Sequence, residues 1–151
     1  MSWLQFVTLT LTGFVACAEF GSYAFVHPVI KSLPPREHLQ VEQGLLKTFG
    51  RVMPVGMTAA PVLAVIYASV APDSEVSWLS GAAVISLFLA LAATIAVNVG
   101  INLRTGRWDV DNPPEGWKTT RHRWEVFQGV RSWLLLVGFV LLCAEAAHVV
   151  G

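Results

Sequence analysis

Four apolar stretches dominate the pattern of hydrophobic and polar residues along the chain. They cover about residues 3–26, 52–71, 78–99 and 132–150. Each has close to the ~20 residues that an α-helix needs to cross ~30 Å of hydrocarbon. None of them shows the two-residue alternation that is typical of a half-buried strand. The pattern therefore predicts an all-α fold, a four-helix transmembrane bundle that forms one integral membrane domain over residues 1–151.

The amino-acid composition is typical of a protein whose partner is the lipid bilayer. Hydrophobic residues make up 54% of the chain and charged residues 13%, whereas soluble domains carry roughly 25% charged residues. Ten Lys and Arg balance ten Asp and Glu, which argues against a nucleic-acid partner because nucleic-acid binders have a basic excess. A homo-oligomer stays open. No Lys or Arg precedes the first apolar stretch, so we expect that stretch to be retained rather than cleaved as a signal peptide.

The charges are distributed very unevenly between the connecting segments. All ten Lys and Arg lie in two long loops, residues 27–51 and 100–131, while the short turn at 72–77 carries only Asp73 and Glu75. Cytoplasmic loops are enriched in Lys and Arg. We therefore expect the plasma (inner) membrane as the location, with both long loops in the cytoplasm and both termini outside.

Both long loops contain signals for helices. Pro34 and Pro35 stand before an amphipathic segment. Because proline is favoured in the first turn of a helix, they predict that a helix starts there. Residues 111–115 combine an Asp/Asn cap with Pro and an acid near the helix start. We expect these segments to continue into the second and fourth membrane helices as helical cytoplasmic extensions, the fourth helix beginning at about Pro114.

Candidate catalytic residues lie in the first helix. Glu19 is an acid within an apolar stretch, where a charged side chain costs at least ~2.5–3.5 kcal/mol, so such residues are usually functional. Tyr23 and His27 follow at i+4 and i+8, on the same face of a regular helix. Pro28 biases His27 toward the helix end. The three side chains suggest a proton-transfer line; a metal half-site formed by Glu19 and His27 is the alternative, and a purely structural Glu19 bonded to another helix stays open.

Further polar residues are predicted to converge at the cytoplasmic mouth of the bundle. Asn98 and Asn102 share a helix face near the end of the third helix, and Arg104, Trp108, Trp124 and Arg131 approach the same depth. Polar groups that converge on an apolar cavity are typical of a ligand site. Packing across helices is the competing role for the two asparagines.

The usual signatures of cofactor and metal sites are missing from the sequence. There is no glycine-rich phosphate loop and no HExxH, GxSxG or CxxC motif. We predict no cofactor, although a metal ion or haem stays open. A pair of His ligands for haem is not evident, because His27 and His148 are expected at opposite ends of the bundle and His38 and His122 outside its core.

One stretch resembles a known family. Asn98, Asn102 and Arg104, followed by Trp108, Pro113-Pro114, Trp117, Arg121, Arg123-Trp124 and Arg131, are similar to the pattern of the anthrone-oxygenase-like family of small four-helix membrane proteins. The resemblance implies oxidation of anthrones to anthraquinones without a bound organic cofactor. It also implicates Asn98, Asn102, Trp108, Trp117, Arg121, Arg123, Trp124 and Arg131 in the site, and we expect these residues and Arg104 to bind the substrate. The chain departs from the family pattern at Gln128, where many relatives have a His.

These observations favour a membrane-bound oxidoreductase of the monooxygenase type that acts on a lipophilic, aromatic small molecule. Glu19 or His27 would act as the base, the two asparagines would hold substrate oxygens, and Arg104, Arg121 and Arg131 would stabilise negative charge. Two other classes stay open: a non-enzymatic binding or assembly subunit, and a metal- or haem-bearing electron carrier.

Overall fold

The computed structural model describes residues 2–70 and 75–150 and is built from four long helical rods. The first rod joins α1 (Trp3–Gly21), the π-helical turn η1 (Ser22–Val26) and α2 (His27–Lys31). The second is α3 (Pro35–Val70) and the fourth is α6 (Trp117–Val150). The third joins α4 (Trp78–Ala93), the π-helical turn η2 (Thr94–Asn98) and α5 (Val99–Thr105). No strand occurs in the described residues, so the predicted all-α, four-helix fold is confirmed.

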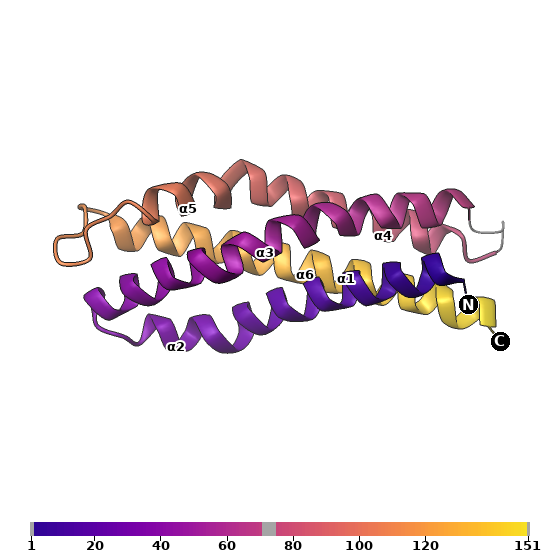
Figure 1. The fold of residues 1–151 in the computed structure, drawn as a ribbon, viewed down its shortest axis with the longest axis horizontal. Helices are drawn as coiled ribbons and strands as arrows, with labels where there is room; N and C mark the ends of the chain where they lie inside the picture. The colour runs from indigo at the N-terminus through magenta and orange to yellow at the C-terminus, as the bar shows by residue number, and fades with distance from the viewer. Residues whose placement is uncertain (1, 71–74, 151) are drawn as a thin grey trace.

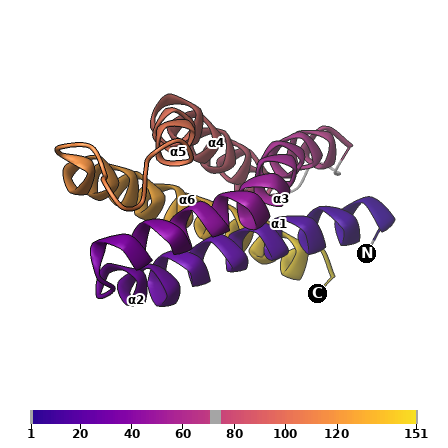
Figure 2. The same ribbon diagram turned by 60° about the vertical axis from the view of Figure 1, so that its left-hand side comes forward.

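The rods lie side by side in an elongated bundle (Figures 1 and 2). Both termini lie at one end, and the connections 32–34 and 106–116 lie at the other (Figure 1). We call these the terminal end and the loop end. Within the predicted turn at 72–77, residues 72–74 fall outside the described part of the chain, as does residue 71 at the predicted end of the second helix.

The helices are longer than the apolar stretches that predicted them. At ~1.5 Å per residue, the 36 residues of α3 span about 54 Å, well beyond the ~30 Å of a hydrocarbon core. The expected helical extensions are therefore continuous with the membrane spans. The fourth helix begins at Trp117 rather than Pro114, directly after Gly116, whose φ of 76° favours glycine.

Two π-helical turns interrupt the first and third rods, and one of them corrects a prediction. The sequence placed His27 at the end of the first helix, but the rod continues through Pro28 to Lys31. The η1 turn ends one residue before His27, and the His27 N–H bonds to the Ser22 carbonyl, one residue further back than in an α-helix. Such a widened turn gives the proline ring room against the preceding turn.

Side chains are distributed as in a protein that faces lipid. Large apolar residues cover the outside, with Phe25 72% and Val55 70% exposed, while Thr8, Thr12 and Ser132 are almost fully buried. Within the described residues, four helices are long and apolar enough to cross a membrane. A water-soluble monomer rarely exposes so much contiguous apolar surface. The exterior is therefore suited to acyl chains, and the polar groups gather between the helices.

Helices α1 and α3 approach each other closely at Gly56. A Cβ added at Gly56 in α3 would lie 2.6 Å from Cγ2 of Val15, a fully buried and conformationally stiff side chain of α1. We expect Gly56→Ala to destabilise the bundle by about 1–3 kcal/mol, because the two helices must separate. Thermal unfolding in detergent measures this. The matched control is Gly44→Ala in the same helix, where the added Cβ meets no atom within 4 Å; an equal loss in both variants would contradict the contact.

Candidate functional site

A cavity of about 190 Å³ lies among the four rods, in the half of the bundle nearer the loop end. This exceeds the ~150 Å³ of an apolar cavity that accommodates benzene. Its apolar wall comes mainly from α3 and from the α4–η2–α5 rod. Its polar lining residues come from all four rods. The polar and aromatic lining residues include Glu19, Ser22, His27, Glu42, Thr94, Asn102, Trp124, Gln128 and Arg131.

Both π-helical turns contribute to this cavity. Ser22 of η1 and Thr94 and Ile95 of η2 line it. A π turn spreads a helix and re-aims the side chains that follow, and such turns occur frequently at functional sites. The two irregular turns therefore help to form the cavity.

The first buried ion pair of the site joins α1 to α6. Arg131 Nη2 lies 2.7 Å from Glu19 Oε2, and Gln128 Nε2 donates to the same oxygen at 2.9 Å. Arg131 also donates to Gln128 Oε1. Ser132 Oγ donates to the Glu19 carbonyl at 3.2 Å. Glu19 is 1% exposed, so its charge is compensated by a dedicated set of donors.

A second buried ion pair joins α3 to α6. Arg121 Nη2 lies 2.5 Å from Glu42 Oε2, and the side chains are only 2% and 3% exposed. Arg121 Nη1 donates to Thr105 Oγ1 at 3.4 Å, and the guanidinium carbon lies 4.2 Å from the Trp124 ring centroid. Stacking of a guanidinium on an aromatic face adds a cation–π attraction. This cluster locks the loop end of α6 against α3 and α5.

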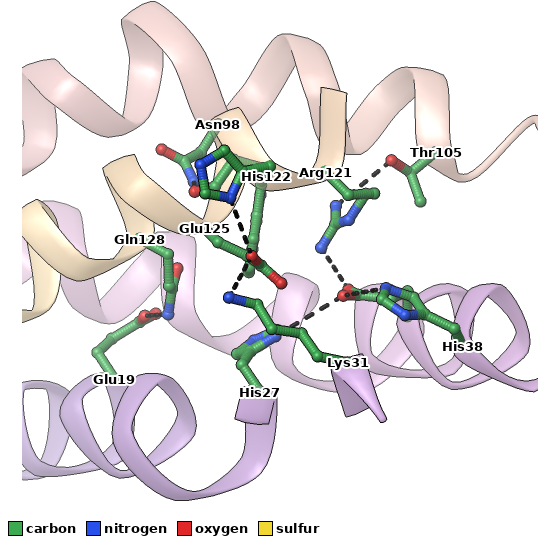
Figure 3. A network of polar contacts seen from close by, with 12 residues as sticks. Glu19, His27, Lys31, His38, Asn98, Thr105, Arg121, His122, Glu125 and Gln128 are labelled. Atoms are coloured by element: carbon green, nitrogen blue, oxygen red, sulfur yellow. Dashed lines mark hydrogen bonds and ion pairs between the residues drawn. The ribbon is translucent and has the colours of Figure 1, made fainter. Parts of the chain in front are cut away.

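Two histidines flank the other oxygen of the Glu42 carboxylate. His27 Nδ1 and His38 Nε2 each lie 3.7 Å from Glu42 Oε1. The dashed lines that leave His27, His38 and Arg121 in Figure 3 mark the three ion-pair contacts with this carboxylate, which has no label there. The His27 ring also packs against Trp124, with 4.8 Å between ring centroids. His27, His38 and Glu42 are 4%, 8% and 3% exposed.

Several buried polar atoms at the cavity have no hydrogen-bond partner within the protein. They are His27 Nδ1, Glu42 Oε1, Asn102 Oδ1, Trp124 Nε1 and Arg131 Nε. A buried polar group without a partner costs about 1–3 kcal/mol. Both donors and acceptors are available here, so the cavity is suited to a molecule with an apolar body and a few polar groups.

Five of the residues singled out in the sequence line this cavity together: Glu19, His27, Asn102, Trp124 and Arg131. Two others lie directly behind its wall. Asn98 Nδ2 donates to the Trp124 carbonyl at 3.1 Å, which is a packing contact across helices. Arg121 holds Glu42.

The remaining candidates lie elsewhere. Tyr23 lines a second cavity, together with His27, Lys31 and Glu125, because η1 breaks the regular i, i+4 stripe on which the prediction was based. Arg104 and Arg123 are exposed, and Trp108 offers only its backbone carbonyl to Gln43 at 2.8 Å. Trp117 packs edge-on against His38 with 5.2 Å between ring centroids.

Sequence reasoning missed two residues of the site. Glu42 was not singled out, and His38 was expected outside the core but is buried. A signal was present, because His38, Leu39, Glu42 and Leu46 recur at helical spacing on one face of the segment that became α3. Glu42 is the acid on this otherwise mostly apolar face, and a buried acid requires a partner.

The residues that could hold a cation are engaged with other side chains. Glu19 is paired with Arg131, and Glu42 is paired with Arg121. Among residues 2–70 and 75–148, no three His, Cys, Asp or Glu side chains are grouped so that they could hold a metal ion.

Comparisons with known proteins give one match. The sequence model of the family described as anthrone oxygenase matches residues 45–141, more than half of the 151-residue chain. No curated protein and no solved structure matches the chain. The matched range includes Asn102, Trp124, Gln128 and Arg131 of the cavity, whereas Glu19, His27 and Glu42 precede it.

Proposed function

Because this chain belongs to the anthrone oxygenase family, we propose that it is a membrane-bound oxygenase that uses dioxygen to oxidise a lipophilic aromatic substrate of the anthrone type. The observation that carries the proposal is the cavity among the four rods. It combines apolar walls with an imidazole whose Nδ1 has no hydrogen-bond partner and with unpaired donors and acceptors. No resident cofactor is part of the proposal.

The proposed orientation places the loop end in the cytoplasm of a plasma (inner) membrane, with both termini outside. All ten Lys and Arg lie in residues 31–51 and 104–131, the two segments that form the loop half of the bundle. Cytoplasmic segments carry such an excess. The substrate cavity then lies toward the inner leaflet.

A lipophilic substrate enters the cavity sideways from the bilayer. Part of the cavity lining is also on the outer surface of the bundle: Ile95 is 64% and Val99 42% exposed, and Pro54 and Thr58 on α3 are exposed as well. These residues form a lateral opening between α3 and the η2–α5 segment. Closer to the loop end, Gln43 Nε2 donates to the Thr105 and Trp108 carbonyls at 3.0 and 2.8 Å. These hydrogen bonds hold α3 against the end of α5.

The proposed reaction needs a base, an oxidant and a site for developing negative charge. His27 takes a proton from the CH₂ carbon of the substrate, and the resulting carbanion gives two electrons to dioxygen, so that a C–O bond forms. The peroxide oxygen recovers the proton from His27 and becomes a hydroperoxide. His27 then removes the second C–H proton, the O–O bond breaks and water leaves, so that CH₂ plus O₂ becomes C=O plus H₂O. A positioned imidazole is the commonest catalytic base.

His27 is a better candidate for the base than Glu19. The Glu19 carboxylate accepts hydrogen bonds from both Arg131 and Gln128, whereas His27 Nδ1 has no hydrogen-bond partner. The Trp124 N–H is available to donate to a substrate oxygen, Asn102 Oδ1 is available to accept from a substrate hydroxyl, and Arg131 contributes positive charge to the same cavity. Glu19 and Gln128 then position Arg131.

The departure at Gln128 is compatible with this assignment. Gln128 and His27 line the same cavity from neighbouring rods. An imidazole supplied by α2 therefore reaches the volume that a His at position 128 would face. The chemistry needs one such group in the cavity, whichever helix carries it.

The test is oxygen consumption by the protein in lipid nanodiscs with an anthrone as substrate. We expect one O₂ consumed and one quinone formed per substrate, at a rate above that of empty nanodiscs and heat-denatured protein. No acceleration over these controls would reject the oxygenase. A Soret band or stoichiometric metal in the purified protein would favour the electron carrier instead, and substrate binding without turnover would favour the binding subunit.

A further inference from the structure

A chain of three buried titratable side chains links the loop end of the bundle to the cavity. It runs from His38 through Glu42 to His27, with 3.7 Å from His38 Nε2 to Glu42 Oε1 and 3.7 Å from Glu42 Oε1 to His27 Nδ1. We propose that these residues form a proton path between the loop-end solvent and the substrate cavity. Its role in turnover rests on the proposed function, but the path itself is a property of the apoprotein.

The outer end of the path is open to water. His38 lines a separate cavity at the loop end, together with Lys118 and His122 of α6, both of which are exposed. The inner end is the substrate cavity, which His27 and Glu42 line but His38 does not. Glu42 therefore lies between a cavity that is lined by exposed charged residues and the substrate cavity, and His38 and His27 contact its carboxylate from these two cavities.

The three facing atoms have no other hydrogen-bond partner in the protein. His38 Nε2, Glu42 Oε1 and His27 Nδ1 are all buried and unpartnered. Arg121 occupies the second carboxylate oxygen of Glu42, so Oε1 is left for the two imidazoles. A shift of well under 1 Å at either histidine brings the 3.7 Å separations into hydrogen-bond range.

The proton is conserved at each step along the path. When His27 has taken a proton from the substrate on one ring nitrogen, it releases the proton on Nδ1 to Glu42 Oε1. Glu42 passes it to His38 Nε2, and His38 releases its other ring proton to water at the loop end. The reverse sequence delivers a proton to a peroxide in the cavity. Imidazole suits this role because its two nitrogens are an acceptor and a donor at once.

Charged groups of α6 and of the first rod set the field along this path. They are Arg121, Lys118, Glu125 and His122 of α6, Lys31 of α2, and the Glu19–Arg131 pair beyond His27. Lys31 and Glu125 lie 2.6 Å apart and offset each other beside the path. The Arg121–Glu42 pair fixes the middle residue.

The experiment follows proton exchange at His27 without relying on turnover. The chain has four His, so ¹⁵N-histidine labelling of the protein in nanodiscs gives one set of ring signals for each. We expect His38→Gln to slow the exchange of the His27 ring proton with solvent by about tenfold or more, since the path loses its outer acid–base group. Added imidazole should restore the rate. His38→Phe tests the same point with a ring that keeps the packing against Trp117.

The matched control is His122→Gln, which removes a histidine from the same loop-end cavity but leaves Glu42 untouched. An exchange rate at His27 that is unchanged in both His38 variants would overturn the path. If exchange depends on His38 but the wild type shows no oxygen consumption, the path stands and the oxygenase proposal fails. If the wild type oxidises substrate and imidazole does not rescue a slow His38→Gln variant, the path is rejected and the oxygenase proposal is retained.

Discussion

Replacing His27 with Gln is expected to lower the turnover of an anthrone substrate by about 10²–10⁴-fold. The reason is that His27 offers the cavity an imidazole, whereas the carboxylates of Glu19 and Glu42 are each paired with an arginine. Glutamine keeps a polar side chain beside Trp124 but cannot accept a proton near neutral pH. The measurement is kcat and KM for oxygen consumption in nanodiscs.

Whether kcat or KM changes in His27→Gln shows which role His27 has. Loss of a base should reduce kcat and leave substrate affinity nearly unchanged, because the apolar walls and Asn102 remain in place. Glu19→Gln is the informative comparison, since it removes a charge from the same cavity while its amide can still accept a hydrogen bond from Arg131. If Glu19→Gln abolished turnover and His27→Gln did not, the assignment of the base would be reversed.

Replacing Arg121 with Met is expected to cost about 3–5 kcal/mol of unfolding free energy, because Glu42 would remain buried without its partner. Both side chains are nearly inaccessible, and their closest atoms lie 2.5 Å apart. Arg121 also stacks on Trp124 and bonds Thr105, so α3, α5 and α6 would all lose a contact. The measurement is the unfolding free energy in detergent, or the thermal midpoint where unfolding is irreversible.

The double variant Arg121→Met with Glu42→Leu distinguishes the loss of an ion pair from the loss of packing. Removing both charges leaves an apolar contact of similar volume, and such replacements are often neutral or stabilising. We therefore expect the double variant to recover most of the stability that Arg121→Met loses. Arg36→Met is the control, since its partner Asp111 is 65% exposed at the side chain and surface pairs contribute at most ~1 kcal/mol. A double variant no more stable than Arg121→Met would show that packing dominates.

The polar residues have two separable roles in this protein. The Glu19–Arg131 and Glu42–Arg121 pairs tie α6 to α1 and to α3, and apolar side chains alone give little specificity between helices in lipid. His27 Nδ1, which lies 3.7 Å from Glu42 Oε1, makes no hydrogen bond within the protein. Asn102 Oδ1 and Trp124 Nε1 make none either and are available to a ligand. We therefore expect that substitutions that lower stability and substitutions that lower activity fall at different residues of this cluster.

The resemblance to a family was based on residues of the second half of the chain. In the structure, only some of these residues line the cavity. Asn102, Trp124 and Arg131 line the cavity, whereas Arg104 and Arg123 are exposed at the loop end. Trp117 packs against His38 rather than against the cavity. A motif thus marks the region of a site more reliably than the function of each residue in it.

The sequence by itself determined that this protein has four helices, where their apolar spans lie, and that two of the spans extend into the loops without a break. These features depend on local hydrophobicity, on span length and on proline positions, and each can be read within one segment. Glu19, His27, Asn102, Trp124 and Arg131 could also be singled out, because polar groups in or beside an apolar helix are costly and few.

Only the tertiary structure decided which of these residues meet. The η1 turn separates Tyr23 from the cavity that Glu19 and His27 line. No local sequence pattern predicted this π-helical turn. Glu42 belongs to the site because Arg121, 79 positions later in the chain, packs opposite it. A pairing between distant helices depends on the rotation and depth of each rod, which are set by packing against its neighbours and are not encoded in any one segment.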